Sequence, residues 1–190
     1  RVAYLYGDAS RTPDLWLLDP GQADGRRVTD LNPEQAEWTL GEPSVVRWTS
    51  ADGSEVEGLL TLPPGRGGAE RHPLVVKLHG GPESAELLVR EPGYIDYHQV
   101  LAGAGWAVLR PNYRGGTGYG DDWVRGMNGD TGGGDYEDIM TGVDHVIAMG
   151  VADPERMVVM GWSFGGISTG WIVTQTDRFA AASAGAMVSN

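Results

Sequence analysis

The sequence feature that most constrains the fold is the hexapeptide Gly-Trp-Ser-Phe-Gly-Gly at residues 161–166. It matches the pattern G-x-S-x-G, it directly follows the apolar run at residues 157–160, and a helical pattern follows it. This order is typical of a tight strand-to-helix corner, in which side chains two positions before and after the serine would collide. Gly161 and Gly165 meet that requirement, so the sequence predicts a strained corner that exposes the Ser163 hydroxyl as a candidate nucleophile.

The pattern itself has low specificity in a chain so rich in glycine. With 30 glycines among 190 residues, chance alone produces roughly 0.2 matches. The position between a strand and a helix gives the match its weight, because that is the context in which the pattern works. At this point a glycine-rich turn with an incidental serine stays open as an alternative.

A second motif, His-Gly-Gly-Pro at residues 79–82, follows the apolar run at residues 74–78. A negatively charged oxygen that forms at the serine needs two backbone N–H donors. The sequence indicates one from Phe164, directly after the serine, and one from this loop, for which Gly81 is the better candidate. His79 is not assigned as the base because it precedes the serine, whereas the histidine follows the serine in enzymes with this corner. We expect a packing or loop-orienting role for it.

The third glycine-rich stretch, residues 111–120, also follows a predicted strand. A phosphate-binding loop is an alternative, but the stretch lacks a Gly-Lys-Ser/Thr ending and does not match G-x-G-x-x-G. We interpret it as a loop that shapes the rim of the site. The acidic residues Asp135, Glu137 and Asp138 begin a predicted helix, where carboxylates offset the helix dipole, so they indicate capping rather than a metal site. We therefore expect no metal and no cofactor.

The whole pattern predicts an α/β fold with a mostly parallel sheet, because strands and helices alternate from about residue 43. The predicted strands there cover residues 45–49, 56–62, 74–78, 106–109, 156–160 and 179–186, and the predicted helices cover 94–104, 135–149 and 164–176. Residues 1–42 differ, because they hold short strands at 2–6 and 14–18 that cannot bury a core alone. We therefore expect two domains, residues 1–42 and residues 43–190.

Composition excludes several classes of function. The net charge is −12 and the isoelectric point is about 4.6, which argues against a nucleic-acid surface because phosphate binding needs clustered Lys and Arg. The chain has no cysteine, so disulfides and thiolate chemistry are excluded, and a reducing, cytoplasmic location is expected. No apolar run approaches the roughly 20 residues of a membrane helix, and we expect no membrane partner.

Taken together, the three motifs resemble the prolyl oligopeptidase family of serine peptidases, and most of all its acylaminoacyl-peptidase and dipeptidyl-peptidase branch. The matching segments are residues 79–82, 112–120 and 161–166, in the order and spacing of the family. A histidine instead of a tyrosine at position 79 favours this branch over prolyl oligopeptidase proper. Ile167 stands where the family often has tyrosine, which is a minor departure.

The resemblance covers nearly the whole chain and implies an α/β-hydrolase fold preceded by the terminal strands of a β-propeller. Residues 1–42 would be the end of the propeller, its last blade and linker, and residues 43–190 the N-terminal part of the catalytic domain. It also implies Ser163 as the nucleophile, with the Gly81 and Phe164 N–H groups as the oxyanion hole. A catalytic aspartate and histidine are implied further along, but only Asp177 is acidic after the serine and no histidine follows.

The resemblance therefore implies a fragment, with an incomplete hydrolase fold that lacks the last strands. The expected function of the parent is hydrolysis of short or N-blocked peptides through an acyl-enzyme, and the 190 residues alone are expected to be inactive. An esterase on the same fold and a non-catalytic assembly fragment are the alternatives. Expected partners are short peptide substrates and the rest of the hydrolase domain, in the parent chain or a second chain, and a homo-oligomer is left open.

Overall fold

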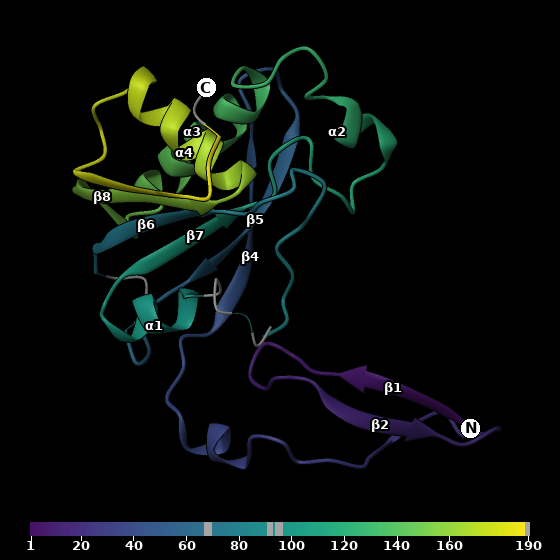
Figure 1. Ribbon diagram of the computed structural model, residues 1–190. Helices are drawn as coiled ribbons and strands as arrows, with labels where there is room; N and C mark the ends of the chain where they lie inside the picture. The colour runs from purple at the N-terminus through teal and green to yellow at the C-terminus, as the bar shows by residue number, and fades with distance from the viewer. Residues whose placement is uncertain (67–69, 91–92, 94–96, 189–190) are drawn as a thin grey trace.

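The computed structural model describes residues 1–66, 70–90, 93 and 97–188, and it contains two separate β-sheets (Figure 1). The first has three strands in the order β1-β2-β3, and the second has six in the order β4-β5-β7-β6-β8-β9. The strands are β1 (Val2–Tyr6), β2 (Asp14–Leu18), β3 (Arg26–Arg27), β4 (Pro43–Thr49), β5 (Glu55–Thr61), β6 (His72–Leu78), β7 (Ala107–Pro111), β8 (Ala152–Trp162) and β9 (Ala181–Gly185).

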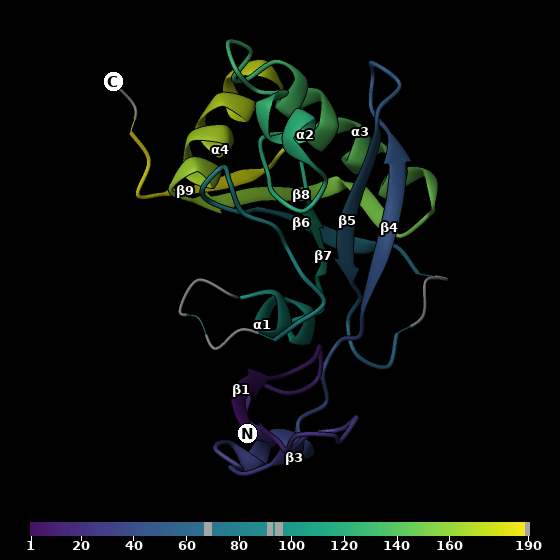
Figure 2. The same cartoon turned by 90° about the vertical axis from the view of Figure 1, so that its right-hand side faces the viewer.

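The six-stranded sheet is parallel over four neighbouring strands, β7-β6-β8-β9, while β4 and β5 pair antiparallel at its other side. The helices are η1 (Pro33–Glu37), α1 (His98–Gly103), α2 (Asp121–Arg125), α3 (Gly134–Ala148) and α4 (Phe164–Gln175). Helices α3 and α4 lie on one face of the sheet, and α1 lies on the opposite face (Figures 1 and 2). This is the α/β arrangement that the alternation of elements predicts.

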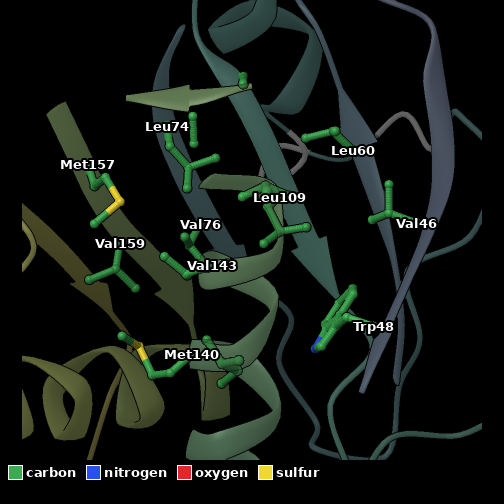
Figure 3. Close-up of a cluster of buried hydrophobic side chains, with 14 of the residues drawn as sticks. Val46, Trp48, Leu60, Leu74, Val76, Leu109, Met140, Val143, Met157 and Val159 are labelled. Carbon is green, nitrogen blue, oxygen red and sulfur yellow. The ribbon is translucent and has the colours of Figure 1, made fainter. Parts of the chain in front are cut away.

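The core lies between the sheet and helices α3 and α4 (Figure 3). The central strands β6 and β7 are rich in β-branched and aliphatic residues, most of which are buried, and this is typical of strands inside a parallel sheet. Helix α3 adds apolar side chains one and two turns apart, so a single stripe of the helix faces the sheet. The labelled members of this cluster are Val46, Trp48, Leu60, Leu74, Val76, Leu109, Met140, Val143, Met157 and Val159.

The predicted strands and helices are all present, with ends that differ by a few residues. The largest difference is at β8, which begins at Ala152 rather than at residue 156. The helix predicted over 94–104 is found as α1, and residues 94–96 lie outside the described residues. The one-turn helix α2 was not predicted, because five residues are too few to show a helical period.

Hydrogen bonds join the first sheet and its linker to the rest of the chain. The Gln99 side chain at α1 accepts from the Gly41 N–H at 2.9 Å and donates to the Gly41 carbonyl at 2.7 Å. The Arg90 N–H donates to the Asp8 carbonyl at 2.8 Å. The second sheet begins with β4 at Pro43, so the predicted boundary falls between the two sheets. The assignment of residues 1–42 to a propeller stays a prediction.

Candidate active site

Ser163 occupies the corner between β8 and α4 and has a backbone conformation that is rare outside glycine. Its φ is 56° and its ψ is −120°, which places a residue with a side chain in the left-handed half of conformational space. The Ser163 N–H donates to the Gly185 carbonyl on β9 at 2.9 Å. Ser163 itself is exposed. The strained backbone and the exposed position together are what a nucleophile on such a corner requires.

The glycines around the serine are required by backbone contacts rather than by contacts between side chains. A Cβ on Gly161 would lie 2.2 Å from the Gly165 carbonyl oxygen. A Cβ on Gly165 would lie 2.3 Å from the carbonyl oxygen of Leu78, at the end of β6. Gly166 has the same constraint, because its Cβ would be 2.4 Å from the Gly185 carbonyl oxygen. The sequence pattern indicated the first two positions, but the need for glycine at 166 depends on β9 and was missed.

The loop at residues 79–82 lies directly beside Ser163. Strands β6 and β8 are neighbours in register, with Leu78 opposite Gly161, so the segments that follow them meet at the carboxyl edge of the sheet. A Cβ on Gly80 would be 3.2 Å from the Ser163 Cβ and 3.8 Å from its Oγ. Gly81 is exposed and has a φ of 122°, which favours glycine. The structure therefore brings the predicted oxyanion loop, Ser163 and Phe164 together.

His79 and Tyr113 form a buried stacked pair under this loop. Their ring centroids are 4.3 Å apart and their planes differ by 5°. The Tyr113 hydroxyl donates to the His79 carbonyl oxygen at 2.6 Å, and the Tyr113 ring also lies 6.5 Å from the Phe164 ring. Burial lowers the pKa of His79 and raises that of Tyr113. Tyr113 was missed as a site residue, because its partner His79 lies 34 positions earlier in the chain.

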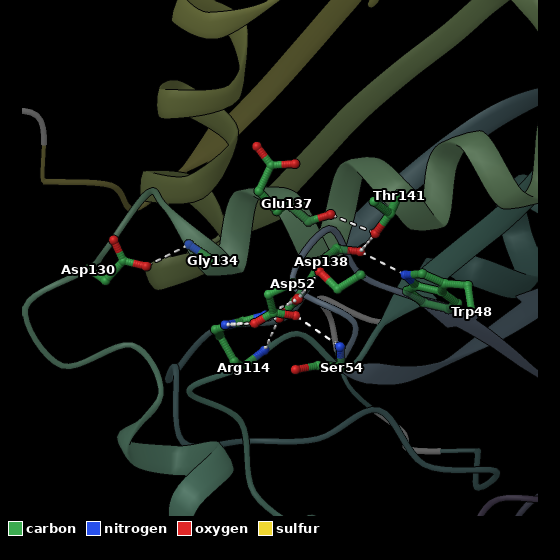
Figure 4. A network of polar contacts seen from close by, with 10 residues as sticks. Trp48, Asp52, Ser54, Arg114, Asp130, Gly134, Glu137, Asp138 and Thr141 are labelled. Atoms are coloured by element: carbon green, nitrogen blue, oxygen red, sulfur yellow. Dashed lines mark hydrogen bonds and ion pairs between the residues drawn. The ribbon is translucent and has the colours of Figure 1, made fainter.

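The loop after β7 is anchored to helix α3 by the buried carboxylate of Asp138 (Figure 4). This carboxylate accepts from the Arg114 backbone N–H at 2.9 Å, from Arg114 Nε at 2.8 Å and from Arg114 Nη2 at 2.7 Å. It also accepts from the Ser50 hydroxyl at 2.6 Å, and Arg114 reaches Asp52 at 2.8 Å. Asp138 was interpreted from sequence as a helix-capping residue. In the structure it instead holds the loop after β7 against helix α3.

Replacing Asp138 with asparagine should lower the free energy of unfolding by about 2 to 3 kcal/mol, because an amide N–H would face the Arg114 guanidinium inside the protein. The measurement is a urea unfolding curve of the full-length protein that contains this chain. The matched control is Asp121→Asn, since the side chain of Asp121 is 89% exposed and pairs with Arg125 one helical turn away. Equal midpoints for the two variants would contradict the prediction.

A cavity of about 250 Å³ lies beside this corner and is lined on one side by Gly80, Gly161 and Trp162. Its wall includes the carboxylate of Glu86, which binds Lys77 Nζ at 3.0 Å and Arg110 Nη1 at 2.8 Å. Burial opposes ionisation of Glu86, but the two cations hold its pKa below the usual value. Glu86 is therefore a charged member of a structural ion cluster.

The other histidines lie away from the serine. His72 begins β6, at the opposite end of that strand from the loop, and His145 stacks on Trp48 from helix α3. His98 lies in α1. Within the described ranges, no group of three acidic or histidine side chains is placed to hold a metal ion. None of the helices in that same part of the chain has the length and apolar character that a membrane crossing requires.

Comparison with known proteins places this corner in a family. The model of the prolyl oligopeptidase family matches residues 94–190, about half of the chain. A Bacillus subtilis protein named uncharacterized peptidase YuxL is 37% identical over 95% of this chain, and the match spans 27% of that protein. The acylamino-acid-releasing enzyme of Arabidopsis thaliana is 40% identical over 62% of this chain and 15% of its own length.

Solved structures agree with the sequence matches. The acylaminoacyl peptidase of Pyrococcus horikoshii superposes with a TM-score of 0.84 at 31% identity, over 98% of this chain and 29% of that one. The chain thus spans less than a third of the length of each of these relatives. The strained serine corner lies in the part that the family model covers. The chain belongs to the prolyl oligopeptidase family of peptidases.

Proposed function

We propose that the protein is a serine peptidase in which the Ser163 Oγ attacks the carbonyl carbon of a peptide bond. The exposed serine with a φ of 56° at the β8–α4 corner is the observation that carries this assignment. As the Oγ–carbon bond forms, a base takes the hydroxyl proton and the carbonyl oxygen becomes an oxyanion. The amine then leaves with a proton, and water hydrolyses the acyl-enzyme.

The oxyanion is stabilised in this proposal by the backbone N–H groups of Phe164 and Gly81. Phe164 is the first residue of α4, a helix of 12 residues, so its N–H lies at the positive end of the helix dipole. The choice of Gly81 is supported by the position of the neighbouring Gly80, where an added Cβ would lie 3.8 Å from the Ser163 Oγ. Donors fixed before the reaction lower the barrier because no reorganisation is needed when the charge forms.

The catalytic base and its carboxylate partner are proposed to come from parts of the protein outside these 190 residues. No histidine follows Ser163, and Asp177 is the single acidic residue after it. His79 is buried with its ring stacked on Tyr113, which does not suit a base that must reach an exposed hydroxyl. A hydroxyl without a base is a weak nucleophile, so the hydrolase fold of this chain is proposed to be incomplete.

The isolated 190-residue chain should therefore fail to react with a fluorophosphonate probe, whereas the full-length protein should be labelled within minutes at Ser163. The measurement is in-gel fluorescence of both proteins, followed by mass spectrometry of the labelled peptide. Fast labelling of the isolated chain would contradict the external base. A full-length protein that stays unlabelled would contradict the serine-peptidase proposal itself.

The proposed substrates are short peptides, including those with a blocked amino terminus. The supporting facts are the names of the relatives, which include acylamino-acid-releasing and dipeptidyl-peptidase enzymes. Turnover of acetylated peptide anilides, free dipeptide anilides and simple esters by the full-length protein would separate the possibilities. Peptide turnover should exceed ester turnover, and the reverse order would favour an esterase.

A further inference from the structure

We propose that His79 is a positioning residue for this reaction, because its ring holds the Gly80 carbonyl and thereby orients the Gly81 N–H toward the oxyanion. The inference rests on the proposed role of Ser163. In this role His79 is neither the catalytic base nor a residue that only packs in the core.

The proposal rests on the hydrogen bond between His79 Nδ1 and the Gly80 carbonyl oxygen, which are 2.9 Å apart. A carbonyl oxygen can only accept, so the ring proton is on Nδ1 and the histidine is the donor. The Gly80 carbonyl and the Gly81 N–H belong to the same planar trans peptide. In such a unit the two groups point in opposite directions, so fixing the carbonyl also fixes the N–H.

The direction in which the Gly81 N–H points follows from the burial of His79. His79 is buried, at 7% exposure, and its ring draws the Gly80 carbonyl toward the interior. The Gly81 N–H is therefore turned outward, onto the surface where Ser163 is exposed and where a Cβ on Gly80 would lie 3.2 Å from the Ser163 Cβ. Among the residues that the structure describes, the Gly81 N–H donates to no other group. It is free to donate to an oxygen at the serine.

The ring is itself held in place by Tyr113. The two rings stack, and the Tyr113 hydroxyl donates to the His79 carbonyl oxygen at 2.6 Å. This carbonyl oxygen also packs near Gly165, whose added Cβ would lie 2.7 Å from it. One buried tyrosine thus joins the loop at residues 79–82 to the first turn of α4. Precise placement matters, because oxyanion donors act only within hydrogen-bond distance of the developing charge.

The test compares His79→Phe and His79→Asn in the full-length enzyme. Phenylalanine keeps a ring to stack on Tyr113 but lacks the Nδ1 donor, so kcat should fall about 100-fold while KM stays within about twofold. Affinity for a peptide aldehyde, whose adduct oxygen occupies the oxyanion position, should fall by a similar factor. Asparagine offers an amide N–H near the position of Nδ1 and should restore kcat to within about tenfold of wild type.

The matched control is His72→Phe, which alters the buried histidine that begins β6, at the opposite end of the strand from the loop. Its kcat should equal that of wild type. A His79→Phe enzyme with wild-type kcat and aldehyde affinity would overturn the inference while leaving the peptidase proposal intact. If His79→Asn does not restore kcat, and kcat and the unfolding midpoint fall in parallel, then His79 has only a structural role. That result would also overturn the inference. An inactive wild-type enzyme would overturn both proposals.

Discussion

Ser163→Ala in the full-length protein should abolish fluorophosphonate labelling and lower kcat by about 10⁴-fold or more, with KM changed only a few-fold. The reason is that the covalent route is lost while substrate binding and the oxyanion donors remain. Steady-state turnover of a peptide anilide and in-gel labelling provide the two measurements. A variant that retains more than about a hundredth of wild-type kcat would show that the nucleophile is another residue.

Two further variants separate loss of the nucleophile from loss of the fold. Ser168→Ala removes a buried hydroxyl one turn further along α4 and should leave turnover unchanged. Ser163→Gly should be as inactive as Ser163→Ala, yet it should raise the free energy of unfolding by about 1 kcal/mol. Glycine adopts a φ of 56° without steric cost, and the relief of strain exceeds the entropy that glycine loses on folding. A less stable Ser163→Gly protein would contradict this account of strain.

Gly165→Ala should lower the free energy of unfolding by about 4 kcal/mol or more, or prevent folding altogether. The added methyl group would lie 2.3 Å from the Leu78 carbonyl oxygen and 2.7 Å from that of His79. Both are backbone atoms within the packed sheet and cannot rotate away as a flexible side chain would. The measurement is a urea unfolding curve of the full-length protein, or its soluble yield if it does not fold.

The control for this prediction is Gly103→Ala in helix α1. Nothing lies within 4 Å of a Cβ at that position, and alanine favours the helix over glycine, so stability should rise by up to about 1 kcal/mol. If Gly165→Ala lowers the free energy of unfolding and Gly103→Ala raises it, the loss at Gly165 is due to the close approach between α4 and β6. If Gly165→Ala has wild-type stability, a methyl group fits between α4 and the end of β6, and the prediction is wrong.

The elements of the sheet could be predicted because each central strand is a short apolar run bounded by turn residues. Gly161 and Gly165 could be predicted because the serine corner imposes a fixed spacing on the local chain. Tyr113 could not, since its role depends on reaching His79 across the boundary between two neighbouring strands. Gly166 and Asp138 were missed or misread for the same reason: their partners lie more than 15 residues away in sequence. Local patterns predict the corner, and only tertiary contacts reveal what supports it.

The backbone torsion at Ser163 also limits which chemistry evolution can install at this position. A residue held at a φ of 56° and a ψ of −120° accepts a Cβ with one heavy substituent far more readily than a branched one. Threonine is therefore excluded as a replacement nucleophile, whereas cysteine has the same branching as serine and could be accommodated. Divergence of the nucleophile on this scaffold is thus restricted to side chains that are unbranched at Cβ.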